Sequence, residues 1–344
     1  MSTITAANAV LTKSRCMYGK RLKEEDYNAL CACRSVSEVA FYLKTRTHYS
    51  DALQNLDEGT VHRRKLEELL FIKEFEEFAR LCRYEFAGDE GFSEYIIMTV
   101  EIKEILRFLR LLFAGSPSEY LLSLPVYFAS HSSVDLYALS RAKSFSEFLD
   151  IADRSRYRKA FRPFKGVENP DFVSIEHALY GYMYSRLLEI VAARKSGDER
   201  AELENIFSTL LDTKNFLHIY RLKKYYNSDE NIIRTLLFGG SHKIKKDIHE
   251  AMITAPDAQT VLDLMKTRTP YAKYFEEKGV TPDNIYSRIK FHTAKKYIHY
   301  SVNPSVVMLS YIMLSQIELG NIVNIIECVR YGLPQEETAE MITV

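Results

Sequence analysis

The segments LKTRTHY at residues 43–49 and MKTRTPY at residues 265–271 are almost identical, and this duplication decides how the chain is built. A divergent copy, IADRSRY, lies between them at residues 151–157. It keeps an arginine, a hydroxyl-bearing residue and a tyrosine at the same offsets, giving the pairs Arg46 and Tyr49, Arg154 and Tyr157, and Arg268 and Tyr271. Self-similarity at a nearly constant interval indicates a chain made of repeated structural units.

The residues that lead into each copy predict a short helix. These leads read CRSVSEVAFY, AKSFSEFLD and APDAQTVLD, and in each a small polar residue precedes the first apolar positions. Such a side chain caps a helix by accepting hydrogen bonds from the free amides of its first turn. We therefore expect the three units to begin in the same way.

A second landmark recurs in the same order along the chain. It has two acidic or amide residues three positions apart, followed by an arginine six positions after the second. Its copies are Glu101, Glu104 and Arg110; Asp212, Asn215 and Arg221; and Asn321, Asn324 and Arg330. The two landmarks together predict three helical units of roughly 110 residues, a size typical of domains, at 10–122, 123–240 and 241–344.

The polar pairs of this second landmark have two interpretations. We favour hydrogen bonds between helices over a surface for a partner protein, although both remain open. A shared acid-base centre fails because the first copy has two carboxylates and the third has none.

Apolar residues recur at helical spacing throughout the chain. The long candidates are residues 63–82, 95–113, 177–194, 202–224 and 306–330, and none alternates with the period of a strand. Glycine and proline number only 13 and 9, so turn signals are scarce. The sequence predicts an all-α protein.

Charge, cysteine content and hydropathy exclude several classes of protein. The 46 basic and 46 acidic residues cancel, which removes the bulk attraction used by nucleic-acid and anionic-membrane binders. Five scattered cysteines indicate reduced, cytosolic thiols rather than a disulfide framework. The most apolar stretch, 306–317, is shorter than the roughly 20 residues of a membrane span, so we expect no transmembrane segment. The first residues also lack the pattern of a signal peptide.

The common catalytic motifs are missing from the sequence. It has no G-x-x-x-x-G-K-[ST] loop, no H-E-x-x-H helix and no G-x-S-x-G elbow. We interpret Gly239-Gly240-Ser241 as a helix C-cap and turn rather than a phosphate cradle. We therefore expect no catalytic residue, no cofactor and no metal.

One basic segment resembles an RNA-binding stripe when it is taken alone. It interleaves cations with aromatic residues: Arg154, Arg156, Tyr157, Arg158, Lys159, Phe161, Arg162, Phe164 and Lys165. Because Arg154 and Tyr157 recur in the other copies, we assign them to the fold. For the remaining charges we favour an acidic protein partner over nucleic acid.

Over nearly its whole length the chain resembles the C subunit of the prokaryotic V-type (A/V-type) rotary ATPases and ATP synthases, the counterpart of the eukaryotic V-ATPase d subunit. The resemblance is carried by three parts of the sequence. They are the repeated tyrosine-containing segments, residues 210–244 (LLDTKNFLHIYRLKKYYNSDENIIRTLLFGGSHKI) and residues 318–342 (ELGNIVNIIECVRYGLPQEETAEMI). The chain departs from the family at Glu104, where an amide is usual, and in the middle segment, which lacks the threonines.

The resemblance implies a funnel-like body in which three helical units have a pseudo-threefold arrangement. It implies a noncatalytic central-stalk (rotor) subunit that connects the central-shaft subunits to the membrane rotor ring, so that ATP turnover and proton or sodium transport are coupled. Such a subunit is cytoplasmic and peripheral to the membrane. Two alternatives stay open: an α-helical scaffold or adaptor unrelated to ion transport, built as an open stack of repeats, and a hydrolase with its site between units.

Overall fold

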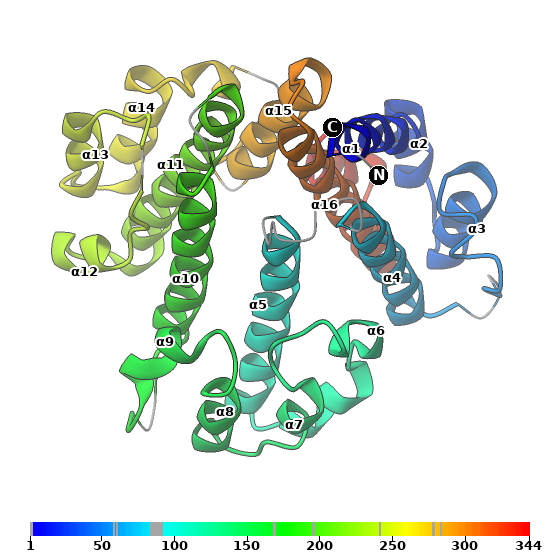
Figure 1. Cartoon of the computed structure of the whole chain (residues 1–344), viewed down its shortest axis with the longest axis horizontal. Coiled ribbons are helices and arrows are strands. Elements are labelled where there is room, and N and C mark those ends of the chain that lie inside the picture. The colour runs from blue at the N-terminus through cyan, green and yellow to red at the C-terminus, as the bar shows by residue number, and fades with distance from the viewer. Residues whose placement is uncertain are drawn as a thin grey trace. The chain divides into compact units, whose positions relative to one another are not determined.

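A computed structural model describes residues 3–57, 59, 61–82, 92–167, 170–194, 197–240, 242–276, 279–282 and 284–344 (Figure 1). Over these ranges the chain forms helices joined by turns, and no strand occurs among them. The prediction of an all-α protein is therefore confirmed. The chain divides into two compact units, Glu90–Arg194 and the combination of Met1–Asp89 with Lys195–Val344.

The unit Glu90–Arg194 is built on two long helices with short ones between them. Its elements are α5 (Phe92–Phe113), η1 (Pro117–Ser123), α6 (Val126–Ala129), α7 (Leu136–Leu139), α8 (Phe145–Ala152), α9 (Arg158–Phe161), η2 (Arg162–Phe164) and α10 (Phe172–Ala192). Its core is rich in aromatic side chains. Phe148 packs edge-on against Phe161 with ring centres 4.9 Å apart, and it stacks on Phe108 at 6.1 Å. Burial of such large rings is a main source of stability in a unit of this size.

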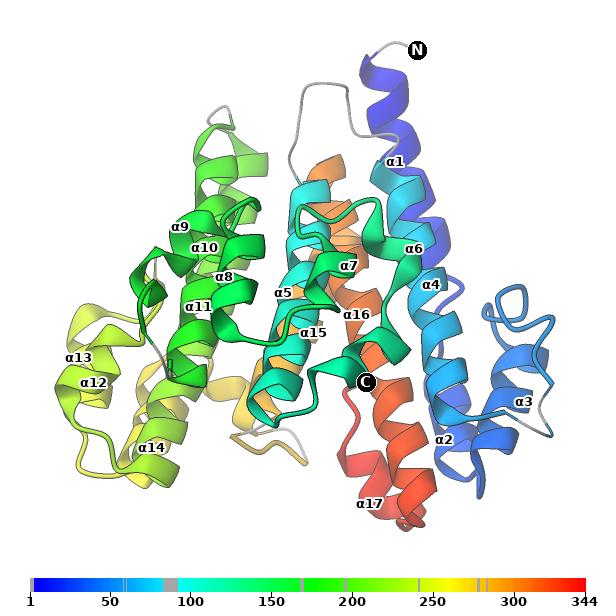
Figure 2. The same ribbon diagram turned by 90° about the horizontal axis from the view of Figure 1, so that it is seen from below.

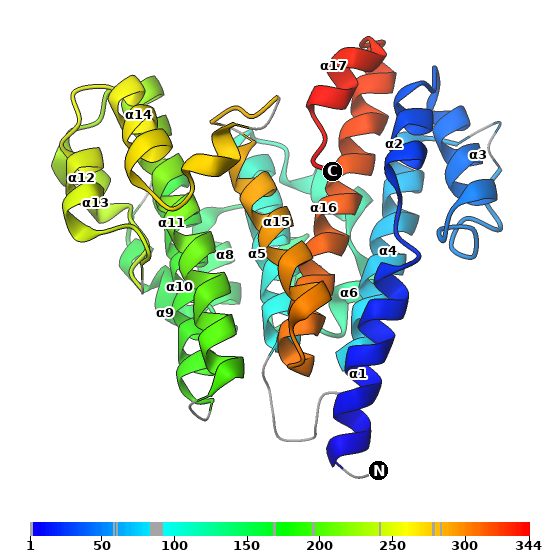
Figure 3. The same ribbon diagram turned by 90° about the horizontal axis from the view of Figure 1, so that it is seen from above.

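The larger unit contains the two ends of the chain. Its N-terminal elements are α1 (Thr3–Tyr18), α2 (Glu24–Cys31), α3 (Val36–Arg46) and α4 (Arg63–Cys82). Its C-terminal elements are α11 (Asp198–Tyr226), α12 (Glu230–Thr235), α13 (Lys246–Ile253), α14 (Ala258–Arg268), η3 (Ala272–Phe275), α15 (Ile285–Tyr300), α16 (Pro304–Tyr331) and α17 (Gln335–Glu340). Helix α16 packs against both α1 and α15 (Figure 3), and α17 packs against α2 (Figure 2).

The described residues of this larger unit include two apolar cores. One joins residues of α2, α3 and α4 to α16, with Leu43 and Ile322 completely buried. The other joins α11 to α13, α14 and α15, with Val261 and Ile289 completely buried. Side chains from opposite ends of the sequence therefore share the first core.

Helix α16 as a whole has the length and composition of a membrane span, although the continuous apolar stretch 306–317 within it is too short to be one. Its mean hydropathy is 1.5 over the most apolar window, but 83% of that window is buried inside the protein. Its serines explain how polar residues are tolerated there, since the Ser310 hydroxyl donates to the Val306 carbonyl 2.8 Å away. These features are those of a core helix.

The predicted long helices agree with the structure to within a few residues. The predicted caps are also confirmed, because Ser35, Ser144 and Asp257 accept hydrogen bonds from the amides of Glu38, Glu147 and Thr260. The prediction for Gly239-Gly240-Ser241 was wrong in part. Helix α12 ends at Thr235 and is capped by Leu236, so the glycines lie in the loop to α13 rather than at a cap; Ser241 lies outside the described residues.

Candidate functional site

The three repeated tyrosines each bind a buried carboxylate on a long helix. In every case the hydroxyl donates a hydrogen bond of 2.9 Å, in the pairs Tyr157–Glu101, Tyr271–Asp212 and Tyr49–Glu318. All six side chains are buried. We call these three arrangements the tyrosine–carboxylate clusters. The first lies within the unit Glu90–Arg194, and the other two lie within the larger unit.

The third cluster corrects the alignment of the polar pairs. The sequence spacing matches Asn321 and Asn324 to the other copies, but the structural counterpart is the pair Glu318 and Asn321. The arginine spacing was misleading because Arg330 lies twelve positions after Glu318, whereas Arg221 lies nine after Asp212. The third copy therefore does contain a carboxylate.

The second residue of two pairs fixes a distant stretch of backbone. The Asn215 amide donates to the Phe238 carbonyl at 2.9 Å and accepts from the Phe238 amide at 2.8 Å. Asn321 bonds the Thr343 backbone in the same way, at 2.7 and 2.9 Å. In the first copy Glu104 instead accepts from the Tyr120 hydroxyl at 3.1 Å. Asn324 is exposed, and its amide donates to the Met341 carbonyl.

A hydroxyl two residues before each tyrosine stabilises the turn that orients the ring. Thr47 donates to the Leu43 carbonyl at 2.6 Å and accepts from the Tyr49 amide at 3.2 Å. Thr269 makes the same two bonds around Tyr271, and Ser155 makes equivalent ones around Tyr157. The shared hydroxyl of the repeated segments thus closes the end of a helix before the tyrosine.

Backbone amides from the start of a short segment complete each cluster. Glu318 accepts from the Leu22 amide at 2.8 Å. Asp212 accepts from the amides of Lys243 and Ile244 at 2.9 and 3.1 Å. Glu101 accepts from the Ser133 amide. Each carboxylate therefore accepts hydrogen bonds both from a tyrosine hydroxyl and from the backbone of another segment.

Each buried carboxylate also has a nearby cation or histidine, and the three differ. Arg21 holds Glu318 through its Nε at 2.9 Å and its Nη2 at 2.7 Å. The Nε of Arg156 lies 3.2 Å from Oε2 of Glu101. In the second cluster Nδ1 of His242 lies 2.7 Å from Oδ1 of Asp212.

Burial shifts the titration of the cluster residues. It raises the pKa of the Tyr49, Tyr157 and Tyr271 hydroxyls, and the adjoining carboxylates raise them further. Burial also raises the pKa of Glu318, while Arg21 and the hydrogen bonds oppose this shift. Burial opposes the charge of Arg21, yet Glu318 and the surrounding tyrosines raise its pKa overall. The tyrosines are therefore neutral donors near neutral pH.

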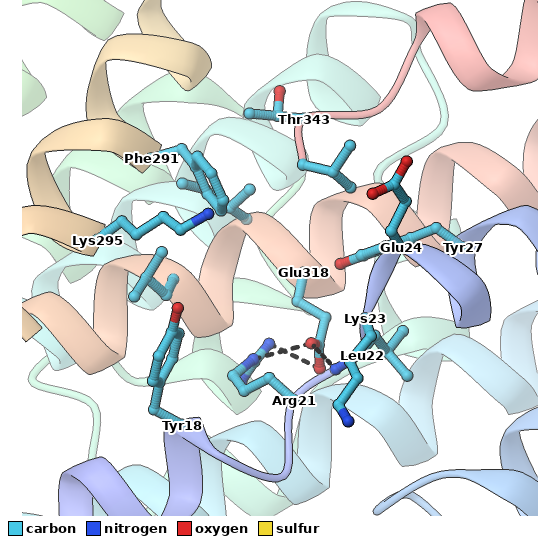
Figure 4. A pocket seen from close by; sticks show the side chains of 13 residues that line it. Tyr18, Arg21, Leu22, Lys23, Glu24, Tyr27, Phe291, Lys295, Glu318 and Thr343 are labelled. Carbon is cyan, nitrogen blue, oxygen red and sulfur yellow. Dashed lines mark hydrogen bonds and ion pairs between the residues drawn. The ribbon is translucent and has the colours of Figure 1, made fainter. Parts of the chain in front are cut away.

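The Arg21–Glu318 pair forms one wall of a pocket of about 530 Å³ (Figure 4). Tyr18, Tyr27 and Lys295 also line it, from α1, α2 and α15. Arg21 is committed to the protein itself, because its Nη1 donates to the Ser315 hydroxyl and its Nη2 to the Ser315 carbonyl. The pair therefore acts as a bridge between the α1–α2 connection and α16.

The predicted site residues separate into two groups. Tyr49, Glu101, Glu104, Tyr157, Asp212, Asn215, Tyr271 and Asn321 are buried and bonded within the chain. The exposed group contains Asn324 and all six arginines, Arg46, Arg110, Arg154, Arg221, Arg268 and Arg330. Several of these arginines still make local contacts: Arg110 lies over the Phe172 ring, Arg268 lies 3.5 Å from Asp247, and Arg330 pairs with Glu327 at 3.2 Å.

The sequence patterns do not identify Arg21, Arg156, His242 and Glu318 as cluster residues. Glu318 had a signal, since an acid three positions before an amide matches Asp212 and Asn215 more closely than two asparagines do. Arg21 and Arg156 had none, because the partners of a buried cation depend on tertiary packing. Within the described part of the chain no three His, Cys, Asp or Glu side chains gather as metal ligands. The hydrogen bonds of each cluster join a long helix to another segment of the chain.

Comparison with known proteins agrees with the family resemblance of the sequence. The family model described as ATP synthase (C/AC39) subunit matches residues 10–341. The A-type ATP synthase C subunit of Pyrococcus furiosus is 26% identical over 262 residues, which cover 73% of this chain and 68% of that protein. The corresponding C subunit of Desulfurococcus sp. is 26% identical over 242 residues, covering 68% and 62%. That of Thermococcus gammatolerans is 34% identical over 107 residues, covering 31% and 29%. Since the family model spans almost the full sequence, the chain belongs to the ATP synthase (C/AC39) subunit family.

Proposed function

We propose that this chain is a central-stalk (rotor) subunit of a V-type ATPase or ATP synthase. It connects the central shaft to the membrane ring, so that ATP turnover and proton or sodium transport are coupled by rotation. The subunit itself is noncatalytic, and it is cytoplasmic and peripheral to the membrane. The observation that carries this proposal is membership of the C/AC39 family over residues 10–341.

The clusters support a mechanical role for the chain. A subunit that transmits torque needs helices that do not slide past one another. Each cluster joins a long helix to a short segment distant in sequence through a buried, charge-assisted hydrogen bond, and such bonds are about twice as strong as neutral ones. The polar residues of the repeat thus serve rigidity rather than chemistry.

Three helical units at 10–122, 123–240 and 241–344, arranged about a pseudo-threefold axis as a funnel, remain our proposal for the architecture. The recurrence of the tyrosine–carboxylate cluster supports three related units. The hydrogen bonds link successive units, because α5 and α11 each bond the repeated tyrosine of the following unit. Helix α16, in the last unit, bonds the repeated tyrosine of the first.

Exposed aromatic residues at the ends of the long helices support partner binding. Phe113 ends α5, Tyr226 ends α11 and Tyr331 ends α16, with exposed fractions of 44%, 67% and 67%. Large exposed apolar side chains are typical of interface centres. We propose that these ends and the exposed arginines meet the shaft or the ring.

The deciding experiment uses membranes that carry the complex with and without this chain. Without it, we expect ATP hydrolysis by the soluble head to continue while ATP-driven ion uptake is lost, and purified chain to restore uptake. In the add-back assay Tyr226→Ser should restore less uptake, whereas Tyr300→Ser, at another exposed tyrosine on α15, serves as the matched control. Full ion uptake without the chain would refute the proposal in favour of a scaffold unrelated to transport.

The arginines offer a second test of the same proposal. Replacing Arg110, Arg221 and Arg330 by serine should weaken assembly while the unfolding temperature stays within the range of ordinary surface changes. If assembly is intact and the unfolding temperature falls, these side chains are structural.

A further inference from the structure

The segment 154–165 differs from its two structural counterparts in charge. Aligned on the repeated tyrosine, RSRYRKAFRPFK at 154–165 corresponds to RTHYSDALQNLD at 46–57 and RTPYAKYFEEKG at 268–279. The first has six basic residues and no acidic one, the second has one basic and two acidic, and the third has three basic and two acidic. The excess of positive charge is therefore not a requirement of the repeated fold.

Most of these cations point into solvent. Arg154, Arg158, Lys159, Arg162 and Lys165 are exposed, and only Arg156 turns inward to Glu94 and Glu101. We call the five exposed residues the basic surface. Among the described residues, Arg154, Lys159 and Arg162 have no acidic partner within the chain. They lie on and beside α9, which can be followed in green in Figure 2.

Two of the three aromatic residues of the segment anchor it in the core of the unit, and the third, Phe164, is half-buried. Tyr157 and Phe161 are 0% and 1% exposed, and Phe161 packs on Phe148. Rings that are buried cannot stack on nucleic-acid bases, which is how single strands gain much of their binding energy. For the same reason these rings cannot insert into a bilayer. The exposed cations are therefore the groups available to bind a partner, and the buried rings hold the backbone that carries them.

The basic surface already binds one carboxylate of its own chain. Lys165 Nζ lies 2.9 Å and Arg158 Nε 3.4 Å from the same oxygen of Asp153. These two cations lower the pKa of Asp153, the hydrogen bond from Lys165 most strongly. Guanidinium groups suit carboxylates because they can donate two parallel hydrogen bonds.

We propose that the basic surface binds an acidic segment of a protein partner, with Arg154, Lys159 and Arg162 as the groups that receive its carboxylates. The buried rings disfavour nucleic acid and lipid, and the pairing with Asp153 shows the chemistry the surface accepts. The proposal does not depend on the rotor assignment, because it rests on charge and burial within the unit Glu90–Arg194.

The test measures binding of fluorescent poly-L-glutamate to the full chain by anisotropy. In the triple variant Arg154→Glu/Lys159→Glu/Arg162→Glu we expect the affinity to fall at least about tenfold, the scale of losing roughly 1.4 kcal/mol. The matched control is Lys266→Glu/Arg268→Glu/Lys273→Glu, which reverses three exposed cations around the third repeated segment. Circular dichroism must show that both variants are folded.

Three results would overturn the proposal. One is an equal loss in both variants, which would mean that only net charge matters. Another is the absence of poly-L-glutamate binding by the parent chain at low salt. The third is that a single-stranded RNA 20-mer, or vesicles of phosphatidylcholine with phosphatidylglycerol, bind more tightly than poly-L-glutamate and lose this binding in the first variant alone.

Discussion

The hydroxyl of Tyr49 donates a hydrogen bond of 2.9 Å to Glu318, which lies 269 positions later in the chain. The tyrosine follows α3 and the glutamate lies in the middle of α16, so this contact joins the first repeated segment to the last long helix. In the other two clusters the same bond joins residues 56 and 59 positions apart. The third cluster is therefore completed by segments from opposite ends of the sequence.

The tyrosine hydroxyls are expected to contribute to stability in a similar way at all three clusters. Tyr49→Phe, Tyr157→Phe and Tyr271→Phe each remove one donor from a buried carboxylate and leave the ring in place. We expect each to lower the free energy of unfolding by about 1.5–3 kcal/mol, the range for hydrogen bonds to charged groups. Denaturant unfolding measures this change, with Tyr300→Phe, at an 82% exposed residue, as the control. A loss no larger than that of the control would show that the clusters do not stabilise the fold.

Arg21 is expected to be more important for stability than any single tyrosine. It is 9% exposed and pairs with the buried Glu318, so Arg21→Met leaves an uncompensated buried charge. Such losses cost about 3–5 kcal/mol. The double variant Arg21→Met/Glu318→Leu should recover part of this loss, because the unpaired charge is gone. Urea unfolding of the single and double variants measures these losses. If the double variant loses as much free energy of unfolding as the two single variants together, the pairing is contradicted.

The sequence alone was sufficient to predict the helices and the tyrosines of the clusters, because both depend on local pattern. Helical spacing identified α4 at 63–82 and α11 to within a few residues, and the duplicated segments identified Tyr49 and Tyr271. It was not sufficient for Arg21 or His242, since neither recurs in the repeats. Their positions depend on how distant helices pack.

The helical period explains the misplaced third pair. Along α16, both Glu318 and Asn321 begin an acidic or amide pair with a spacing of three, so the pattern fits in two registers one helical turn apart. Only the contacts of Tyr49 and Thr343 distinguish the two. A helical repeat allows such a shift because residues three positions apart lie on nearly the same face.

Asn321 and Asn324 give a matched pair for testing that register. Asn321 is buried and satisfies both the amide and the carbonyl of Thr343, so Asn321→Leu leaves two buried backbone groups without partners. We expect a loss of about 2 kcal/mol or more. Asn324→Leu changes an exposed residue and should stay within about 0.5 kcal/mol of the parent. Thermal unfolding of the two variants measures the difference. A larger loss of stability in Asn324→Leu than in Asn321→Leu would contradict the pair Glu318 and Asn321.

His48 should make the fold sensitive to acid. Burial, followed by the positive charges of Arg21 and Lys73, lowers its pKa to about 3, against the opposing effect of Asp51. Its Nε2 lies 3.5 Å from Glu318, but that carboxylate is already engaged by Arg21, so the ring stays neutral. An unfolded histidine has a pKa of about 6.5, so between these values the unfolded chain binds the proton more tightly. The stability from His48 is thus complete above pH of about 6.5 and is lost as the pH falls toward 3.

His48→Gln, which cannot take up a proton, should flatten the fall in unfolding midpoint between about pH 7 and 4.5, whereas the exposed His62→Gln should not. Identical pH profiles for the parent and His48→Gln would show that His48 is not the group that titrates.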